Sequence, residues 1–282
     1  MLGLTVISVL LAVLIAGGLY LRSQPLLETQ SVGHLLSSSE WKPTKGEFGF
    51  FPFIMGTLWV TAIAIILALP FCILTAIYLS EYAHHRVRKL LVPFIDMLSG
   101  IPPIVFGVWG VLFVVPLIRE YLGPYFTGNS SGYSVLAGGI VLAIMISPMI
   151  ITVLMEVFVA VPKELKDASL SLGATKWQTV KFVLLKKSRP GIIAASVLAI
   201  SRAFGETIAV MMVCGNTVHV PHSPLDAGYP LPALIANNYG EMLSVKLYDS
   251  ALLFAALILF VIIFLFNAVA RYILGRIERS MS

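Results

Sequence analysis

Two charged residues, Arg202 and Glu206, interrupt a long apolar run that reads GIIAASVLAISRAFGETIAVMMV and covers residues 191–213. An arginine stays protonated at working pH, and its planar set of donors matches the oxygens of an oxyanion. A glutamate one helical turn away can pair with it and compete with a bound anion. The two residues therefore suit a site that an oxyanion enters and leaves again.

The same pair also has a purely structural interpretation. An arginine at the centre of a bilayer costs about 2.5–3.5 kcal/mol, and an ion pair on one helix would lower that cost. Apolar replacements of buried pairs are often neutral or stabilising, however, and charged residues inside spans usually face an aqueous path. Gly205 and Ala203 thin the neighbouring surface, which leaves room for a ligand or another helix. These arguments favour an anion site over a pair that only joins helices.

The composition indicates what must position these residues. The chain has 282 residues, of which 58% are hydrophobic and only 12% are charged. A soluble domain carries about 25% charged residues, so the membrane class is indicated. Apolar runs long enough to cross a bilayer as helices cover approximately residues 1–21, 52–79, 91–118, 134–161, 191–214 and 249–274. Because these runs are continuous rather than alternating, we expect an all-α integral membrane protein with six transmembrane helices.

The lysines and arginines are distributed unevenly between the connecting segments. Thirteen lie in residues 80–90, 162–190 and 271–279, and five lie in the other loops. Since cytoplasmic loops carry the excess of Lys and Arg, the first group is predicted to be cytoplasmic, together with both termini. The net charge of +5 is then a consequence of topology. We expect membrane lipids as the surroundings and no nucleic acid as a partner.

The first apolar run has two interpretations. No basic residue precedes residues 1–21, and the following LIAGGLYLRS could resemble the cleavage region of a signal peptide. A signal peptide normally has a basic start and a shorter apolar stretch. The sequence therefore favours a retained first helix.

The third run carries residues that should disturb a helix. Pro102, Pro103 and Gly107 predict an interruption or a kink there, and broken helices often line transport paths. The carboxylates of Asp96 and Glu156 lie near the ends of spans, where we expect helix-end or interhelical hydrogen bonds.

Residues 162–190, PKELKDASLSLGATKWQTVKFVLLKKSRP, are longer than an ordinary connection. Apolar residues at helical spacing predict a first short helix, which Gly173 should end. Thr175 and Gln178 have the spacing of a capping box that opens a second helix, with an apolar stripe of Trp177, Val180 and Leu184. Two short helices joined at a glycine offer a shape that another protein can bind. The alternative is an interfacial pair that only anchors the chain.

No pattern in the chain predicts catalysis. The sequence contains no G-x-x-x-x-G-K-[ST] phosphate loop and no H-E-x-x-H motif. Cys72 and Cys214 lie within expected spans, and His219 and His222 have no further ligands at metal-binding spacing. We therefore expect no catalytic residue, no metal site and no cofactor in this chain.

The segment DASLSLGATKWQTVKFVLL resembles the EAA loop of bacterial ABC importer permeases. Asp167 stands for the usual Glu, and Lys186 stands where Pro is usual. Four further segments, in order, resemble the phosphate-specific (Pst) importer permeases of the PstC type, over about residues 38–242. These segments are SSSEWKPTKGEFGFFPFIMGTL, SGIPPIVFGVWG, SRAFGETIAVMMVCGNT and LPALIANNYGEM.

This resemblance implies a type I ABC importer permease fold with a cytoplasmic coupling (EAA) loop. It implies that Asp167, Ala168, Ser169 and Gly173 meet an ATPase subunit, and that Arg202 and Glu206 line the phosphate path. The expected division is an N-terminal helix and extracytoplasmic loop at 1–51 and a permease core at 52–276, with the EAA loop at 162–190.

The resemblance also implies partners in a bacterial cytoplasmic (inner) membrane. These are a second homologous permease of the PstA type, two ATPase subunits of the PstB type that bind ATP and Mg²⁺, and an extracytoplasmic phosphate-binding protein of the PstS type. Two rival functions remain open: a permease of the same fold for sulfate or molybdate, and a secondary transporter or channel that needs no ATPase.

Overall fold

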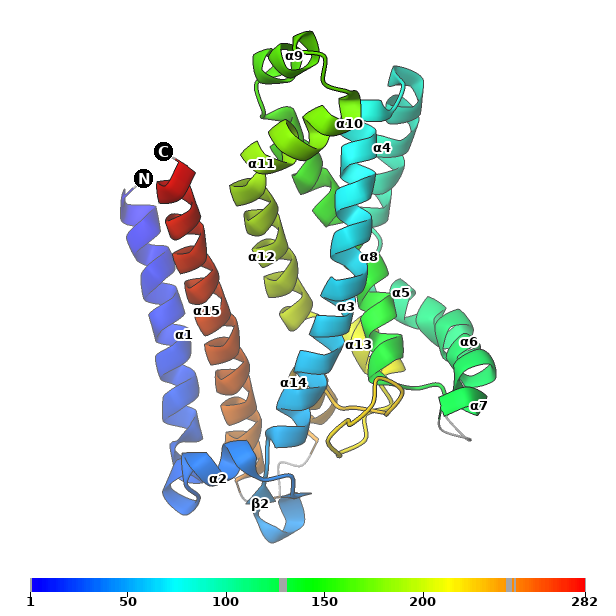
Figure 1. Cartoon of the computed structure of the whole chain (residues 1–282). Coiled ribbons are helices and arrows are strands. Elements are labelled where there is room, and N and C mark those ends of the chain that lie inside the picture. The colour runs from blue at the N-terminus through cyan, green and yellow to red at the C-terminus, as the bar shows by residue number, and fades with distance from the viewer. Residues whose placement is uncertain (1, 127–130, 242–244, 246, 282) are drawn as a thin grey trace.

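Long helices that run roughly side by side form most of the molecule (Figure 1). This computed structural model describes residues 2–126, 131–241, 245 and 247–281. The helices are α1 (Leu2–Thr29), α2 (Val32–Ser37), α3 (Phe51–Ile77), α4 (His85–Ser99), α5 (Pro103–Trp109), α6 (Val115–Leu117), α7 (Gly123–Phe126), α8 (Val135–Val159), α9 (Lys163–Ser171), α10 (Lys176–Thr179), α11 (Leu185–Lys187), α12 (Arg189–Gly205), α13 (Ile208–Val213), α14 (Leu231–Asn238) and α15 (Tyr248–Met281).

Shorter elements complete the chain. The π-helical segments η2 (Tyr78–Tyr82), η3 (Gly110–Val114), η4 (Ile118–Leu122) and η5 (Val180–Leu184) extend or join helices. A two-stranded antiparallel hairpin pairs β1 (Trp41–Lys42) with β2 (Glu47–Phe48) around the 3₁₀ turn η1 (Pro43–Lys45). At its edge the Lys42 ammonium lowers the pKa of the Glu40 carboxyl through a hydrogen bond and through its charge.

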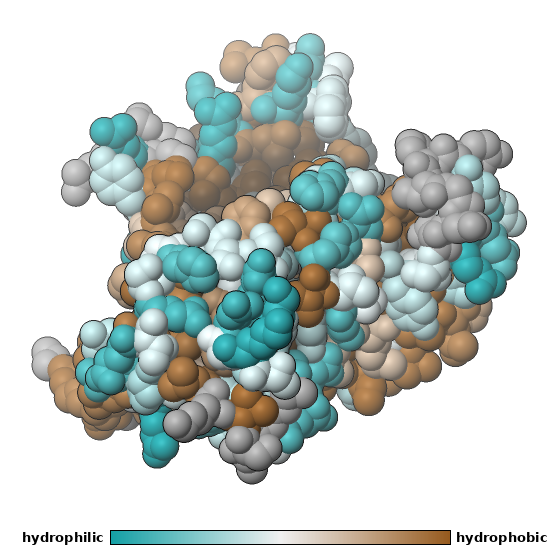
Figure 2. Space-filling model, turned by 90° about the horizontal axis from the view of Figure 1, so that it is seen from below, coloured by the Kyte–Doolittle hydropathy of each residue, from teal (hydrophilic) through white to brown (hydrophobic). Residues whose placement is uncertain are grey.

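Five helical stretches of the described chain are long and apolar enough to cross a membrane. They are Val9–Thr29, Phe51–Tyr82, Pro103–Leu122, Val135–Val159 and Tyr248–Arg276. Seen along the helices, hydrophobic residues occupy the flanks, and hydrophilic residues gather at the end that carries the strands (Figure 2). Four of the six expected spans are thus single apolar helices, with shifted ends.

The other two expected spans are each divided. In the third, α4 ends at Ser99 and α5 begins at Pro103, because Pro103 holds the preceding Pro102 in an extended conformation. The predicted interruption is confirmed at the prolines, but Gly107 lies within α5 and breaks nothing. A Cβ at Gly107 would overlap Met212, so its role is to let α13 approach.

The fifth expected span is divided between α12 and α13. Helix α12 ends at Gly205, Glu206 is extended (φ −76°, ψ 124°), and α13 begins at Ile208. Glycine is a poor helix former, which weakens the helix at this point. A continuous helix through residues 191–214 was expected, so this expectation is wrong.

The main core lies where α3 packs against α8. Gly138 and Gly139 face this contact, and a Cβ on Gly139 would overlap the side chain of Ile63. Small residues let membrane helices approach closely, so van der Waals packing can join them without help from water. The close α3–α8 pair forms the frame to which α4, α12 and α13 attach.

A second core closes the end of the molecule that carries the strands. The Trp41 ring lies 5.0–5.4 Å from the rings of Phe48, Phe50 and Phe53, mostly edge to face. It also lies 6.2 Å from Tyr248 at the start of α15. This aromatic cluster holds β1, α3 and α15 together.

Helix α14 is part of the second core. Its Leu231 and Leu234 side chains are completely buried. The backbone N–H of Leu231 donates to the Thr57 hydroxyl of α3 over 2.8 Å. This bond satisfies a donor at the start of α14, and it fixes the helix inside the fold.

The two ends of the chain lie at one end of the molecule. Figure 1 places the start of α1 and the end of α15 side by side, at the same end as α9, α10 and α11, while α2 and the strands lie at the opposite end. The basic segments that the sequence assigns to one side of the membrane are therefore at one end of the structure.

Candidate functional site

Arg202 lies in the last turn of α12, directly before the helix break. Its side chain is exposed, and its Nη1 donates to the sulfur of Met149 on α8 over 3.7 Å. A thioether sulfur is a weak acceptor, so most of the donors of the guanidinium are free to bind a ligand. Gly205 beside it has open space where a Cβ would stand.

Glu206 does not form the expected pair with Arg202. No salt bridge joins the two residues in the part of the chain that the structure describes. The physical reason is the helix break: residues four apart meet only on a continuous helix, and Glu206 is already extended. The break instead leaves an exposed guanidinium, without an ion-pair partner among the described residues, and a half-buried carboxylate at the same point of the fold.

A polar bond next to Arg202 joins α12 to the last helix. The Ser201 hydroxyl donates to Oδ1 of Asn267 on α15 over 2.8 Å, and the Asn267 amide donates to the Ile263 carbonyl. Sequence reasoning missed Asn267, although an amide inside the apolar run of α15 could have marked it. The bond fixes the position of α12 one residue before the arginine.

The segments α9, α10, η5 and α11 form a helical hairpin, residues 163–187, which we call the α9–α11 hairpin. Gly173 joins its arms with φ +85°, a left-handed conformation that favours glycine. The capping box of Thr175 and Gln178 is present as predicted. The hydroxyls of Ser169 and Thr179 lie 3.0 Å apart and connect the two arms.

The outer surface of this hairpin exposes several large apolar side chains among its charged residues. Its large exposed side chains are Leu165, Leu170, Leu172, Trp177 and Phe182, with Leu172 exposed to 89%. Of the stripe predicted for the second arm, Val180 and Leu184 are buried, whereas Trp177 points outward and is 53% exposed. Exposed apolar patches of this kind mark interaction sites.

The family-implied coupling residues lie on the same hairpin. Asp167, Ala168 and Gly173 are exposed, and Ser169 is half-buried against Thr179. Gly173 has no atom within 4 Å of the position of a Cβ, so its surroundings within the chain are open.

An ion pair that sequence reasoning missed ties the hairpin to the membrane helices. Nζ of Lys166 on α9 lies 2.5 Å from Oε1 of Glu81 in η2, and the side chains are only 16% and 20% exposed. The same ammonium donates to the Phe158 carbonyl on α8 over 3.4 Å. Lys166 thereby connects the hairpin to the ends of both α3 and α8. Because Lys166 and Glu81 are 85 residues apart in the sequence, no local pattern could have revealed the pair.

The carboxylate of Asp96 forms a contact between helices. Asp96 accepts a hydrogen bond from the Thr152 hydroxyl over 3.4 Å, so the interhelical bond predicted for it is confirmed. Within the described residues, no group of three His, Cys, Asp or Glu side chains has the geometry to hold a metal ion.

The fold resembles that of membrane chains from two solved ABC transporters. The chain is similar to a chain of a bacterial alginate ABC transporter, with a TM-score of 0.68 and 13% identity over 98% of this chain and 93% of that one. It is also similar to a chain of the MetNI methionine ABC transporter, with a TM-score of 0.61 and 19% identity over 79% and 93%.

The sequence defines the family. The family of binding-protein-dependent transport system inner membrane components matches residues 68–279, and this chain belongs to it. It is 35% identical to the phosphate transport system permease protein PstC of Xylella fastidiosa (strain 9a5c), over 90% of this chain and 82% of that protein. It is 33% identical to the probable PstC of Methanocaldococcus jannaschii, over 97% and 91%. It is also 38% identical to the probable ABC transporter permease YqgH of Bacillus subtilis, over 86% and 77%.

Proposed function

We propose that the chain is the permease subunit of an ATP-driven importer that carries inorganic phosphate across the cytoplasmic (inner) membrane. The observation that carries this proposal is the 33–35% identity to phosphate permeases along nearly the whole chain. The free guanidinium at the break between α12 and α13 supports it, because arginine suits the tetrahedral, multiply charged phosphate ion.

In this proposal phosphate passes Arg202 and Glu206. The break in the fifth span exposes backbone within the membrane, which is tolerated where it lines a cavity or is covered by protein. Arg202 attracts the phosphate ion and the neighbouring carboxylate of Glu206 repels it. The phosphate is therefore bound weakly enough to be released. Selection of phosphate then depends mainly on the separate binding protein.

The α9–α11 hairpin is the proposed docking site for the ATPase. Its exposed large apolar side chains support this proposal. The resemblance to the EAA loop assigns Asp167, Ala168, Ser169 and Gly173 to the contact with that subunit. The hairpin end, with both chain termini, then faces the cytoplasm, in agreement with its Lys and Arg content. The ATP and Mg²⁺ belong to two PstB-type subunits, and a PstA-type permease and a PstS-type binding protein complete the importer.

The ion pair of Lys166 and Glu81 is expected to transmit motion from the hairpin to the helices. Replacing Lys166 by Met leaves the half-buried Glu81 without its partner, which is costly. We expect the ATPases to stay bound while the ATP hydrolysed per phosphate transported rises several-fold. The measurement is the ratio of ATP hydrolysis to uptake in proteoliposomes of the assembled complex.

The control is Lys163→Met, which removes an exposed lysine from the same helix. The charge-reversed double variant Glu81→Lys/Lys166→Glu should restore much of the coupling, because the pair is re-formed in the opposite order. An unchanged ratio in Lys166→Met would show that the pair only stabilises the hairpin.

The function itself is tested by uptake of labelled phosphate, sulfate and molybdate into proteoliposomes of the complex. We expect ATP-dependent phosphate uptake and little uptake of the other two anions. Preferential sulfate or molybdate uptake would assign the chain to another oxyanion. Full transport activity of the purified chain alone, without any ATPase, would assign the chain to the secondary transporters or channels.

A further inference from the structure

Met149 on α8 is the one side chain in the described part of the chain that holds the guanidinium of Arg202. Its sulfur lies 3.7 Å from Nη1, and Arg202 makes no ion pair among those residues. Arg202 lies roughly 20 Å along α12 from the first residue of that helix, Arg189, so it is deep in the expected span. A cation at that depth is normally paired with a carboxylate or with backbone carbonyls. A thioether is therefore an unusual partner.

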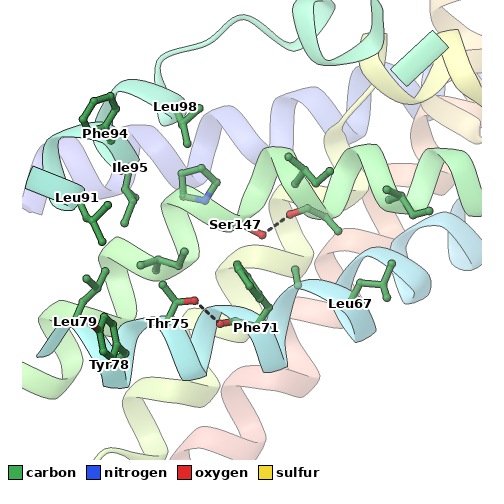
Figure 3. A pocket seen from close by; sticks show the side chains of 16 residues that line it. Leu67, Phe71, Thr75, Tyr78, Leu79, Leu91, Phe94, Ile95, Leu98 and Ser147 are labelled. Atoms are coloured by element: carbon green, nitrogen blue, oxygen red, sulfur yellow. Dashed lines mark hydrogen bonds between the residues drawn. The ribbon is translucent and has the colours of Figure 1, made fainter. Parts of the chain in front are cut away.

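The turn of α8 that carries Met149 has two faces with different surroundings. Ser147 lines an apolar pocket of about 600 Å³ between α3, α4 and α8, and its hydroxyl donates to the Ala143 carbonyl of the same helix (Figure 3). Two residues further along a helix, the side chain is rotated by about 200°. Met149 thus lies on the other face, where α12 packs against α8, and it is half-buried there. Its side chain reaches Arg202 from this helix contact.

A thioether suits a cation that must also bind an anion. Its sulfur is an uncharged, weak hydrogen-bond acceptor, so it orients the guanidinium and gives it up to a ligand at little cost. A carboxylate in the same place would form a charge-assisted bond, roughly twice as strong as a neutral one, which every passing anion would have to displace. The unbranched side chain of methionine can also follow the guanidinium when the guanidinium turns towards a ligand.

The carboxylate that could compete for the guanidinium is Glu206. It lies four residues after Arg202, is half-buried, and has no ion-pair partner among the described residues. A guanidinium without its contact to Met149 would gain most by turning towards this carboxylate, because opposite charges attract strongly away from water. An ion pair of Arg202 and Glu206 would occupy the donors that a phosphate ion needs.

We propose that Met149 is a positioning residue of the anion site. Its thioether holds the guanidinium of Arg202 towards the path and away from Glu206, through a bond that phosphate can displace. Met149 itself does not contact the phosphate ion. Because it acts only through Arg202, its role rests on the proposed passage of phosphate past that residue.

The test measures phosphate binding to the assembled complex before the binding protein is added. Inorganic phosphate that binds the complex has a broadened phosphorus NMR line, and a titration in a detergent without phosphorus gives the dissociation constant. Arg202→Gln supplies the signal of all other phosphate sites, including the nucleotide sites of the ATPases. Met149→Leu keeps the size of the side chain but removes the acceptor. The dissociation constant of the Arg202 site should rise about two- to fivefold, the effect of one weak hydrogen bond.

A role of Met149 in packing alone predicts a different pattern. The matched control, Met145→Leu, makes the same change one turn earlier on α8, at a buried side chain, and should leave the dissociation constant unchanged. In a Glu206→Gln background, Met149→Leu should have little effect, because no carboxylate remains to draw the guanidinium away. A packing defect would instead cause the same change in both backgrounds. The thermal stability of each complex shows whether the variant is folded.

Two results would overturn the role of Met149 while the phosphate path stands. One is an equal dissociation constant in Met149→Leu and in the unmodified complex. The other is an equal rise with Glu206 and with Gln at position 206. Equal phosphate binding by the unmodified complex and by Arg202→Gln would contradict the phosphate path itself, and the role of Met149 with it.

Discussion

Arg202→Gln is expected to lower phosphate uptake by roughly 10- to 100-fold, because charge-assisted hydrogen bonds contribute about 1.5–3 kcal/mol each. The substitution keeps the length of the side chain and some of its donors, but it removes the charge. Since the guanidinium makes only a weak bond to Met149, its loss should cost the fold little. The measurements are uptake in proteoliposomes and the thermal stability of the complex.

The double variant Arg202→Gln/Glu206→Gln separates a ligand role from a structural one. If Arg202 binds phosphate, the double variant folds and binds its ATPases while uptake stays lost. Recovery of phosphate uptake in the double variant would contradict the hypothesis that Arg202 binds phosphate, and Arg202 would then have a structural role. Arg119→Gln is the control, because Arg119 also has an acidic neighbour, Glu120 at 3.7 Å, but belongs to η4 and not to the break between α12 and α13.

Gly173→Asp should release the ATPase subunits and abolish transport while the membrane helices stay folded. The left-handed conformation at φ +85° costs a non-glycine residue about 1–2 kcal/mol. A carboxylate among Leu172, Trp177 and Phe182 would also have to lose water in the interface, at a cost of several kcal/mol. The backbone strain lowers the stability of the free and the bound chain alike, so only the lost hydration of the carboxylate weakens ATPase binding, and that cost alone exceeds the roughly 1.4 kcal/mol of a tenfold loss in affinity. ATPase retention on the purified complex measures the effect.

The control for this variant is Gly46→Asp. Gly46 also has a positive φ, +74°, and open space around its Cβ position, but it lies at the opposite end of the molecule. The complex that carries Gly46→Asp should lose a similar amount of stability but should keep its ATPase subunits bound. Full ATPase binding and full transport in Gly173→Asp would show that the hairpin is not the docking site.

The sequence was sufficient for the features that depend on local chemistry. The apolar runs predicted most of the helices, the two prolines predicted the gap before α5, and the Thr175–Gln178 spacing predicted the cap of α10. These signals work because solvation, ring geometry and capping act within one helical turn.

The sequence was insufficient where distant segments decide. The break at Glu206 lies in a run with no proline, where packing of α13 against α5 competes with helix continuation. Neither the Lys166–Glu81 pair nor the Ser201–Asn267 bond can be read from spacing, because each joins elements far apart in the chain. Arg202 lacks its partner because the helix breaks before Glu206. Since the break could not be predicted from the sequence, the loss of the Arg202–Glu206 pair could not be predicted either.

The aromatic cluster around Trp41 can be completed only late in the synthesis of the protein. Its ring needs Phe53 from the second span and Tyr248 from the start of the last helix. Ribosomes add about 5–20 residues per second, so roughly 10–40 s separate the synthesis of Trp41 from that of Tyr248. During that time the segment before α3 lacks its last aromatic partner. Chains that end before α15 therefore leave this aromatic surface open, which makes them ready substrates for membrane quality control.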